Sequence, residues 1–527
     1  MRSFFLLLTL LLTVGGCREA PAGEDSTAVR RPNILFAIAD DASFPHMGAY
    51  GTTWFSTPAF DRIAREGLLF NRAYTPNAKC APSRACILTG RNSWQLEEAA
   101  NHSPFFPAKF ATVVEALAAH GYRTGYTGKG WAPGDPGQRN GRRRELTGPA
   151  YNAIQREAPT EDMSGIDYAA NFANFLAEGE GSASPFFFWY GGYEPHRAYT
   201  YGSGLAQTGR TLADPRVPAM WPDTDTVRTD LLDYALEIDY FDTQLGEMLQ
   251  LLEERGELDN TLIVVTADNG MPFPRIKGQA YEMSNHLPLA VRWADGIERP
   301  GRKIEDFVSF IDLAPTFLAV AGVDWSDSGM QPATGKSLRP LFAGQELDAP
   351  FRDQVLIGKE RHDVGRPDDR GYPIRGIVSG DYLYVKNYAP DRWPVGNPET
   401  GYLNTDGSPT KTQLLRMRRS GTDTSALWSL NFGKRPGEEL YNIRQDPYCV
   451  SNLVDDANLS AQLAALRERM EGALRQEGDP RMAGNGAVFD NYPYSGAVRD
   501  YYNRYLAGEE VPASWVEAGD YEQGPLD

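Results

Sequence analysis

Continuous apolar runs and helical repeats alternate along the first two thirds of the chain. Apolar runs without polar alternation suit strands that are buried on both faces of a parallel sheet. Such runs lie at 32–39, 185–190 and 260–267, and a shorter strand is expected within 122–131. Helical patterns lie at 57–67, 112–121 and 226–256. The alternation predicts an α/β fold with a large doubly wound, mostly parallel sheet flanked by helices.

The pattern changes after residue 375. Residues 376–387 and 439–443 read as strands with no helix between them, and 459–476 has helical spacing. They predict a smaller C-terminal antiparallel sheet plus one helix. The long polar segment 389–435, punctuated by Gly and Pro, is expected to be either a substrate loop or disordered. The expected division is a signal peptide at 1–17, a tether at 18–31, a catalytic domain at 32–375, an α+β subdomain at 376–480 and an irregular tail at 481–527.

Residues 1–17 read as an export signal. Arg2 supplies the charged start, and the apolar run at 4–14 is too short to span a membrane. The run ends in Gly-Gly-Cys17, which resembles a bacterial lipoprotein box. We therefore expect an exported protein anchored by lipid on Cys17 in the bacterial envelope, either in the periplasm or at the outer membrane and cell surface. A plain signal peptide with a chance cysteine is the alternative.

Length and charge narrow the possible functions. A chain of 527 residues can bury a large core and is long enough for two domains. Its formal net charge of −18 argues against a nucleic-acid binder, which needs a basic face, but allows an anionic substrate held by a few local cations. Two of the four cysteines, Cys86 and Cys449, have no assigned role, and we expect no disulfide framework.

Oxygen-bearing side chains follow two of the buried strands. Asp40 and Asp41 come directly after the first run, and Asp268 and Asn269 come directly after the run at 260–267. Ligands of open α/β sheets bind beyond the carboxyl ends of the strands. Adjacent carboxylates there repel each other unless a cation holds them. The four side chains predict a site for a hard divalent cation, for which Ca²⁺ fits best, Mg²⁺ next and Zn²⁺ poorly.

The stretch from Cys80 to Arg91 carries the second cluster of candidate chemistry. Pro82 suits the first turn of a helix, and Gly90 suits its left-handed cap. Cys80 would then lie at a helix N-terminus with Arg84 one turn further on the same face. Local physics leaves two readings open, a reactive thiol and a buried structural cysteine.

The ordered string Cys80-x-Pro-Ser-Arg-Ala…Leu-Thr-Gly-Arg resembles the signature of the type I, formylglycine-dependent sulfatases of the alkaline phosphatase-like superfamily. The resemblance implies that a maturation enzyme oxidises Cys80 to formylglycine. One hydroxyl of the hydrated aldehyde would attack sulfur, and Arg84 would hold that diol. The resemblance also implies that an oxygen at position 80 joins the four strand-end ligands around the cation.

Three further residues match the family pattern. Lys129 follows a short strand between glycines, and Lys277 follows Asn269 at a short distance; both resemble the lysines that contact the sulfate. His196 follows the strand at 185–190 and resembles the histidine that protonates the leaving group. The chain departs from the family at Trp131, where sulfatases usually have a histidine that assists the formylglycine chemistry.

The resemblance extends from residue 31 to about residue 453 and is nearest to the heparan N-sulfatases, or sulfamidases. Asp268-Asn-Gly-Met-Pro-Phe-Pro, Glu194-Pro-His-Arg and the run at 438–453 carry it. It implies a sulfated carbohydrate as the substrate, with sulfamate or ester as the bond that is cut. Loops bearing His102, Arg361 and His362 are candidates for binding the sugar, and each equally suits an ordinary surface position.

Two other functions remain open at this point. A phosphodiester or phosphonate hydrolase of the same superfold would use a similar pocket, because a fold does not fix a function. A non-catalytic lipoprotein that binds sulfated glycans is the alternative from a different class, and the departure at Trp131 is its only support.

Overall fold

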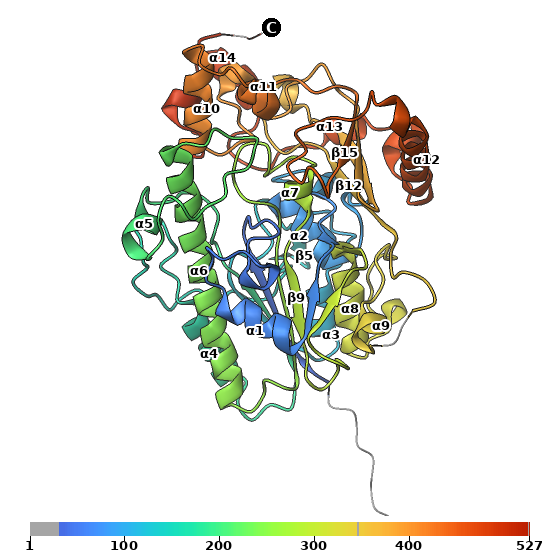
Figure 1. The fold of residues 1–527 in the computed structure, drawn as a ribbon. Coiled ribbons are helices and arrows are strands. Elements are labelled where there is room, and N and C mark those ends of the chain that lie inside the picture. Colours follow the sequence, from blue (N-terminus) through green and yellow to red (C-terminus); the bar gives the residue numbers. More distant parts are fainter. Residues whose placement is uncertain (1–30, 345–346, 525, 527) are drawn as a thin grey trace, which may run out of the picture.

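The computed structural model describes residues 31–344, 347–524 and 526 (Figure 1). The expected signal peptide, Cys17 and nearly all of the expected tether lie outside these residues. Within the described ranges, no helix combines the length and the apolar character needed to cross a bilayer.

A sheet of seven strands in the order β10-β2-β9-β8-β1-β7-β4 forms the centre of the molecule. The neighbours from β8 to β4 are parallel, and β9 runs antiparallel to β8 and β2. This confirms the predicted mostly parallel sheet. The strands are β1 (Asn33–Ala39), β2 (Leu68–Phe70), β4 (Arg123–Gly128), β7 (Phe186–Gly191), β8 (Thr261–Ala267), β9 (Leu289–Arg292) and β10 (Arg302–Ile304).

Helices cover both faces of this sheet, which is why its central strands lack polar alternation. On β1, Leu35 and Ala37 pack into the core beneath α1, α4 and α6, whereas Ile34 and Phe36 pack into the core beneath α2, α3 and α8. These helices are α1 (Pro58–Glu66), α2 (Cys80–Thr89), α3 (Val113–Ala119), α4 (Tyr168–Glu178), α6 (Asp225–Glu254) and α8 (Leu313–Val320).

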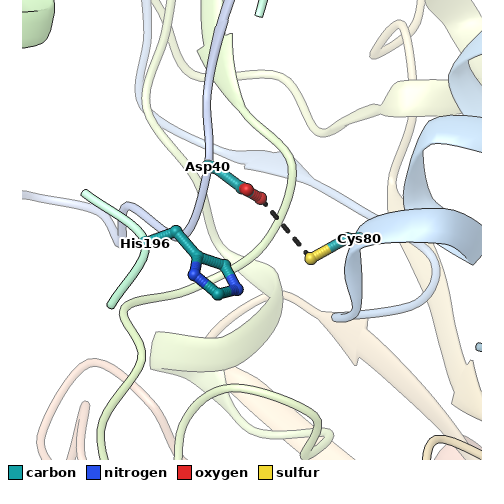
Figure 2. Close-up of side chains that lie close together, drawn as sticks. All are labelled: Asp40, Cys80 and His196. Carbon is teal, nitrogen blue, oxygen red and sulfur yellow. Dashed lines mark hydrogen bonds between the residues drawn. The ribbon is translucent and has the colours of Figure 1, made fainter. Parts of the chain in front are cut away.

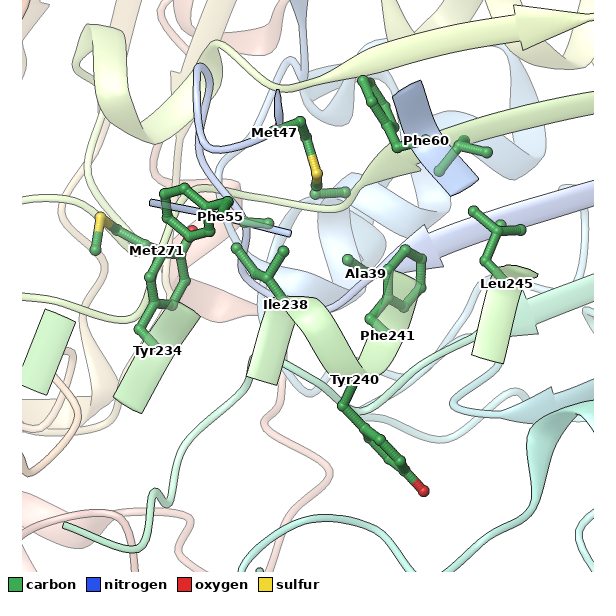
Figure 3. Packing of buried hydrophobic residues seen from close by; sticks show 14 of the residues in the cluster. Ala39, Met47, Phe55, Phe60, Tyr234, Ile238, Tyr240, Phe241, Leu245 and Met271 are labelled. Carbon is green, nitrogen blue, oxygen red and sulfur yellow. The ribbon is translucent and has the colours of Figure 1, made fainter. Parts of the chain in front are cut away.

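The long helix α6 is the main support of one face. Its apolar positions, spaced by three and four residues, are buried as the sequence predicts. Figure 3 shows Ile238 and Phe241 of this helix beside Ala39, the last residue of β1, and Tyr234 next to Phe55. Ala39 directly precedes Asp40, so the packing of α6 fixes the strand end from which the acidic pair projects.

The N-terminus of helix α1 is capped by a residue of another helix. The side chain of Thr57, which directly precedes α1, makes no capping bond. Asp242 of α6 instead accepts hydrogen bonds from the backbone N–H groups of Ala59 and Phe60, both at 2.8 Å. The two helices are thereby joined, because a buried carboxylate satisfies N–H groups that would otherwise lack partners.

A smaller antiparallel sheet, in the order β12-β13-β14-β15, lies beside the large one. It begins at β12, which is upstream of the boundary expected at residue 376, because the short run at 354–359 was not recognised as a strand. Helix α12 packs on it through Leu466, Met470 and Leu474. The elements are β12 (Gln354–Lys359), β13 (Ile374–Ser379), β14 (Tyr382–Asn387), β15 (Glu438–Asn442) and α12 (Ser460–Gln476). The predicted small sheet plus helix is confirmed.

The polar segment between β14 and β15 contains two helices and is not a disordered loop. These are α10 (Pro409–Arg419) and α11 (Leu427–Phe432), and Figure 1 shows them at the same end of the molecule as the small sheet. The last residues form short helices joined by turns, including α13 (Val488–Asn491) and α14 (Tyr501–Leu506). The remaining short elements are β3 (Ala73–Tyr74), β5 (Gln138–Arg139), β6 (Arg142–Arg143), β11 (Val308–Ser309), α5 (Ser203–Gln207), α7 (Glu282–Asn285) and α9 (Arg339–Phe342).

Candidate active site

The carboxyl ends of β1 and β8 bring the predicted oxygen ligands together. The two strands are parallel neighbours in register, with Ala39 opposite Ala267, so the residues that follow them emerge at one edge. Asp41 has a left-handed backbone (φ 77°), and its N–H donates to Asp268 Oδ1 at 3.1 Å. Cys80 begins helix α2 opposite this edge, with its Sγ 3.4 Å from Asp40 Oδ1.

These side chains fit a hard divalent cation. Atoms of Asp40, Asp41, Cys80 and Asp268 all lie within 4.8 Å of one another. Asn269 donates its amide N–H to Asp41 Oδ1 at 2.7 Å, while its buried Oδ1 has no hydrogen-bond partner in the described part of the chain. A buried amide oxygen left without a donor is costly, and a cation would satisfy it. Carboxylate and amide oxygens favour Ca²⁺ or Mg²⁺ over softer metals.

Three basic side chains surround the acidic ones. Lys129 Nζ lies 2.5 Å from Asp40 Oδ2, and Lys277 Nζ lies 2.6 Å from Asp41 Oδ2. Burial alone would raise the pKa of Asp40, but Lys129 and Arg84 together hold it well below its usual range. The site therefore combines an ionised Asp40 with ammonium groups that are positioned to face an anion, whereas burial and the Asp40 charge raise the pKa of Asp268 to about 7.

Several acceptors hold the Arg84 side chain in one orientation. Its guanidinium is fully buried and donates from Nε to Asp268 at 2.7 Å and from one terminal nitrogen to the carbonyls of Lys129 and Gly130, at 2.8 and 2.9 Å. A planar fork with this many acceptors has one orientation. Arg84 thus links α2 to the ends of β4 and β8.

The environment of Cys80 disfavours a reactive thiolate. The residue lies at a helix N-terminus as predicted, and Gly90 closes the helix with φ 68°. However, burial raises the pKa of the Cys80 thiol far above its ordinary value, and the nearby Asp40 charge raises it further. Together they outweigh the positive charge of Lys129, which lowers the pKa. At neutral pH the unmodified side chain is a protonated thiol and a poor nucleophile.

His196 follows β7 and faces the same edge of the sheet (Figure 2). Its Nδ1 lies 2.6 Å from the Arg197 carbonyl oxygen, which fixes Nδ1 as the protonated nitrogen. Its Nε2 lies 3.9 Å from Asp41 Oδ2. Burial lowers the pKa of His196, and Lys277 lowers it further. The ring therefore points Nε2 at the acidic cluster, but burial and Lys277 lower its pKa more than Asp41 and Asp40 raise it.

Trp131 has a structural contact in the place where the family has a histidine. Its indole Nε1 donates to the Ala81 carbonyl at 3.1 Å, and its ring packs edge-on against Phe106. The contact holds the first turn of α2, which carries Cys80. Trp131 therefore supports the position of the candidate nucleophile from behind and offers no imidazole to it.

The candidate sugar-binding residues divide into two groups. His102 and His362 line the cavity next to Cys80. Arg361 does not, because its guanidinium donates to the backbone carbonyls of Tyr492 and Pro493 and holds the C-terminal segment in place. Of the two possibilities that the sequence left open for Arg361, the structure supports neither a cavity position nor an ordinary surface position, because the side chain is buried against the C-terminal segment. The neighbouring Glu360 is equally occupied, by buried ion pairs with arginines of β13 and the C-terminal segment.

The cavity has a volume of about 350 Å³ and is closed by residues that the sequence did not single out. Asp406, from the segment before α10, lies 2.8 Å from Lys277 Nζ. Tyr494 and Trp515 reach the cavity from the C-terminal segment, and Lys79 and Tyr193 line it beside Cys80 and His196. A charged residue directly before Cys80 was visible in the sequence. The other residues lie in segments without periodicity and gave no signal.

Two family models match the chain. The sulfatase model matches residues 32–323, and the model of the N-sulphoglucosamine sulphohydrolase C-terminal region matches residues 276–388. The first covers more than half of the sequence and includes every candidate catalytic and metal-binding residue except Asp406, which lies beyond both matches.

Curated relatives and solved structures agree with these matches. Human N-sulphoglucosamine sulphohydrolase is 27% identical, over 91% of this chain and 95% of its own length. An ulvan-active sulfatase of Formosa agariphila is 25% identical, over 87% and 77% of the two chains. A protein solved in complex with its substrate D-glucosamine-2-N,6-O-disulfate has a TM-score of 0.59 at 20% identity, covering 85% and 98%. The phosphonate monoester hydrolase of Agrobacterium radiobacter has a TM-score of 0.62 at 19% identity, covering 86% and 97%.

Proposed function

Because this chain belongs to the sulfatase family, we propose that it hydrolyses a sulfate ester or sulfamate of a sulfated saccharide by means of a formylglycine made from Cys80. The observation that carries the proposal is the position of Cys80. It lies within 4.8 Å of carboxylate oxygens of Asp40, Asp41 and Asp268, and it lines one cavity together with Lys129, Lys277 and His196. The family relation makes the chain an enzyme and removes the alternative of a protein that only binds glycans.

Lys129 and Lys277 would bind the sulfate oxygens. A sulfate group is a poor electrophile because its negative oxygens repel an incoming nucleophile, and preorganised cations reduce that repulsion. Both ammonium groups line the cavity, and their carboxylate partners hold them in place without filling it. Lys277 is held from two sides, by Asp41 and Asp406, so its position does not depend on the substrate.

The residue at position 80 would supply the attacking oxygen. A formylglycine hydrate contributes a hydroxyl nucleophile and a second hydroxyl for release of the sulfate, which a thiol does not offer. The raised pKa of the Cys80 thiol supports a role as a precursor, because an unmodified thiol here stays protonated. Arg84, which forms ion pairs with Asp40 and Asp268, would orient the formylglycine hydrate through charge-assisted hydrogen bonds. A maturation enzyme of the host is the required partner.

His196 would protonate the leaving oxygen or nitrogen. Its Nδ1–H is held by the Arg197 carbonyl, so Nε2 is the nitrogen free to carry a proton to the substrate. The lowered pKa makes the protonated ring a stronger acid than an ordinary imidazolium, and the bound sulfate would favour protonation by its negative charge.

We propose Ca²⁺, with Mg²⁺ as the alternative, as the ion held by Asp40, Asp41, Asp268, Asn269 and the residue at position 80. When bound, such an ion neutralises charge that develops on sulfate oxygens. The carboxylates of this set would otherwise repel the substrate, so the ion and the two lysines act in the same direction.

The first substrate class to test is N-sulfated glucosamine. The match to the N-sulphoglucosamine sulphohydrolase C-terminal region and the similarity to the human enzyme support it. The second candidate function is phosphonate or phosphodiester hydrolysis, which the structural similarity to the phosphonate monoester hydrolase supports. Export and lipid attachment at Cys17 remain proposals about residues outside the described ranges.

The test combines mass spectrometry with kinetics. A peptide that contains residue 80, from protein made in a host with active formylglycine maturation, is expected to carry an aldehyde in place of the thiol. Cys80→Ala should abolish sulfate release, whereas Cys86→Ala is the matched control, because it replaces another buried cysteine of the same helix. Hydrolysis of an aryl phosphonate but not of any sulfate or sulfamate would transfer the proposal to the second function. An unmodified thiol in active enzyme would refute the nucleophile.

A further inference from the structure

Three lysines line the cavity, and they differ in their partners. Lys129 and Lys277 each lie within ion-pair distance of a carboxylate, whereas the described residues offer Lys79 Nζ neither an ion pair nor a hydrogen bond. Lys79 is nevertheless only 5% exposed. A buried ammonium without a partner is unfavourable, because desolvation is not offset by an opposite charge. An anion that enters the cavity would provide that offset.

The backbone fixes where Lys79 projects. The residue is extended (φ −151°, ψ 147°) and directly precedes helix α2. Its N–H donates to the Asn77 carbonyl at 2.9 Å, and its carbonyl accepts from the Ser83 N–H at 3.0 Å. The main chain is thus held on both sides, and the side chain enters the cavity from the wall next to Cys80. Only the side-chain torsions remain free to adjust to a ligand.

The groups around Lys79 leave its charge uncompensated. The two carboxylates that line the cavity are already paired, Asp406 with Lys277 at 2.8 Å and Asp363 with Arg366 at 3.1 Å. The neighbouring imidazoles do not add negative charge. His362 is fixed by Asn77 Oδ1 at 2.6 Å and by the Gly278 carbonyl at 3.2 Å, and His102 lies beside it on the cavity wall.

We propose that Lys79 is a specificity-determining residue that binds a second anionic group, a sulfate or a carboxylate, on the same saccharide. This rests on the proposed function, in which Lys129, Lys277 and the cation take the sulfate that is released. Lys79 approaches Cys80 from the cavity wall that also carries His102, and burial holds the pKa of His102 well below its usual value, so its neutral ring is suited to a sugar hydroxyl. The enzyme would therefore prefer doubly charged saccharides over singly sulfated ones.

The test measures binding without turnover. Titration calorimetry of the Cys80→Ala protein measures the Kd of three ligands. These are D-glucosamine-2-N-sulfate, D-glucosamine-2-N,6-O-disulfate and N-sulfated glucosamine linked to a uronic acid. Lys79→Met in this background is expected to raise the Kd of a doubly charged ligand at least about ten-fold, which is about 1.4 kcal/mol. It should change the Kd of the singly sulfated ligand less than about two-fold. Lys79→Arg should retain most of the preference, and Lys303→Met is the matched control at an exposed lysine.

The ligand that responds identifies the second anion. A loss confined to the disulfate assigns Lys79 to a second sulfate, and a loss confined to the uronic-acid ligand assigns it to a carboxylate. An equal loss for all three ligands would overturn the proposal, because Lys79 would then contact the sulfate that is released. Unchanged affinities would overturn it as well. Thermal melting of Lys79→Met should equal or exceed that of the parent, since an unpaired buried charge is removed. Charge-selective binding without sulfate release by the mature parent would refute the proposed function and leave Lys79 assigned.

Discussion

Binding of Ca²⁺ is expected to raise the melting temperature by a modest and calculable amount. The perturbation is to compare protein stripped with a chelator against the same protein in excess Ca²⁺. The donors are buried oxygens of Asp40, Asp41, Asp268 and Asn269, which the unfolded chain does not hold together. An ion that binds the folded state alone stabilises it by mass action. Lys129 and Lys277 already compensate part of the acidic charge, so folding itself should not require the ion.

The magnitude follows from the size of the fold. At a Ca²⁺ concentration about 100 times its Kd, the folded state gains about 2.7 kcal/mol. Unfolding entropy is about 2.1 cal/mol/K per residue, so a structure of roughly 500 residues has a total near 1 kcal/mol/K. Dividing the first by the second gives a rise of about 2–3 °C. A larger shift would indicate a higher ratio of Ca²⁺ to Kd, and each ten-fold increase in that ratio adds about 1 °C.

Scanning calorimetry with and without chelator measures the shift in melting temperature. Two variants test whether the shift comes from the proposed cation site. Asp268→Asn removes one negative charge from the ligand set and should remove most of the Ca²⁺ response. Asp391→Asn is the control, because it removes an exposed carboxylate far from the site in sequence and should leave the response intact. The same protein in Mg²⁺ should respond less, since Mg²⁺ demands a stricter octahedral geometry. If the parent shows no response, or if both variants respond equally, the cation site is refuted.

Three further predictions concern stability. Burial lowers the pKa of His46 from its ordinary 6.5 to about 3. Between pH 6.5 and pH 3 the folded state therefore binds fewer protons than the unfolded state. Because of this difference, the free energy of unfolding falls as the pH falls through that window, by up to about 5 kcal/mol. His46→Phe should lose less stability between pH 6.5 and 4 in urea titrations, and equal losses would contradict this. Trp131→Phe loses the hydrogen bond to the Ala81 carbonyl and should lower the free energy of unfolding by about 1 kcal/mol. An unchanged urea midpoint would show that this hydrogen bond does not contribute to stability. Arg375→Met leaves the buried Asp479 without its ion-pair partner and Glu360 with Arg481 alone, and should cost about 3–5 kcal/mol, against under about 1 kcal/mol for the exposed Arg469→Met; similar losses would contradict the assignment.

Much of the candidate site was predictable because it follows the ends of parallel strands. Asp40 and Asp268 each follow an apolar run that is buried on both faces, and such runs are visible in the sequence. Lys129 and His196 follow β4 and β7, which pair in parallel with each other, and β7 pairs with β1. The carboxyl ends of parallel neighbours share one edge, so position along the sequence was enough to gather these residues.

The roles of several other residues depended on contacts that no sequence period encodes. Arg361 and His362 are adjacent in the chain, yet one holds the C-terminal segment and the other lines the cavity. Asp406 reaches Lys277 from a polar segment that was expected to be a loop or disordered. In such segments the direction of a side chain is set by packing against distant elements, and neither a helical nor a strand repeat specifies it.

The sequence by itself determined the fold class, the strand ends that carry the ligands and the family signature around Cys80. These are local properties, because hydrophobic periodicity and turn residues act within a few residues of one another. Only the tertiary structure decided that burial raises the pKa of the Cys80 thiol, that Trp131 supports α2, and that Lys79 is the cavity lysine to which the described residues offer no ion pair or hydrogen bond. The physical reason is that burial and electrostatic neighbours are sums over elements far apart in the chain, and they exist only once those elements are packed together.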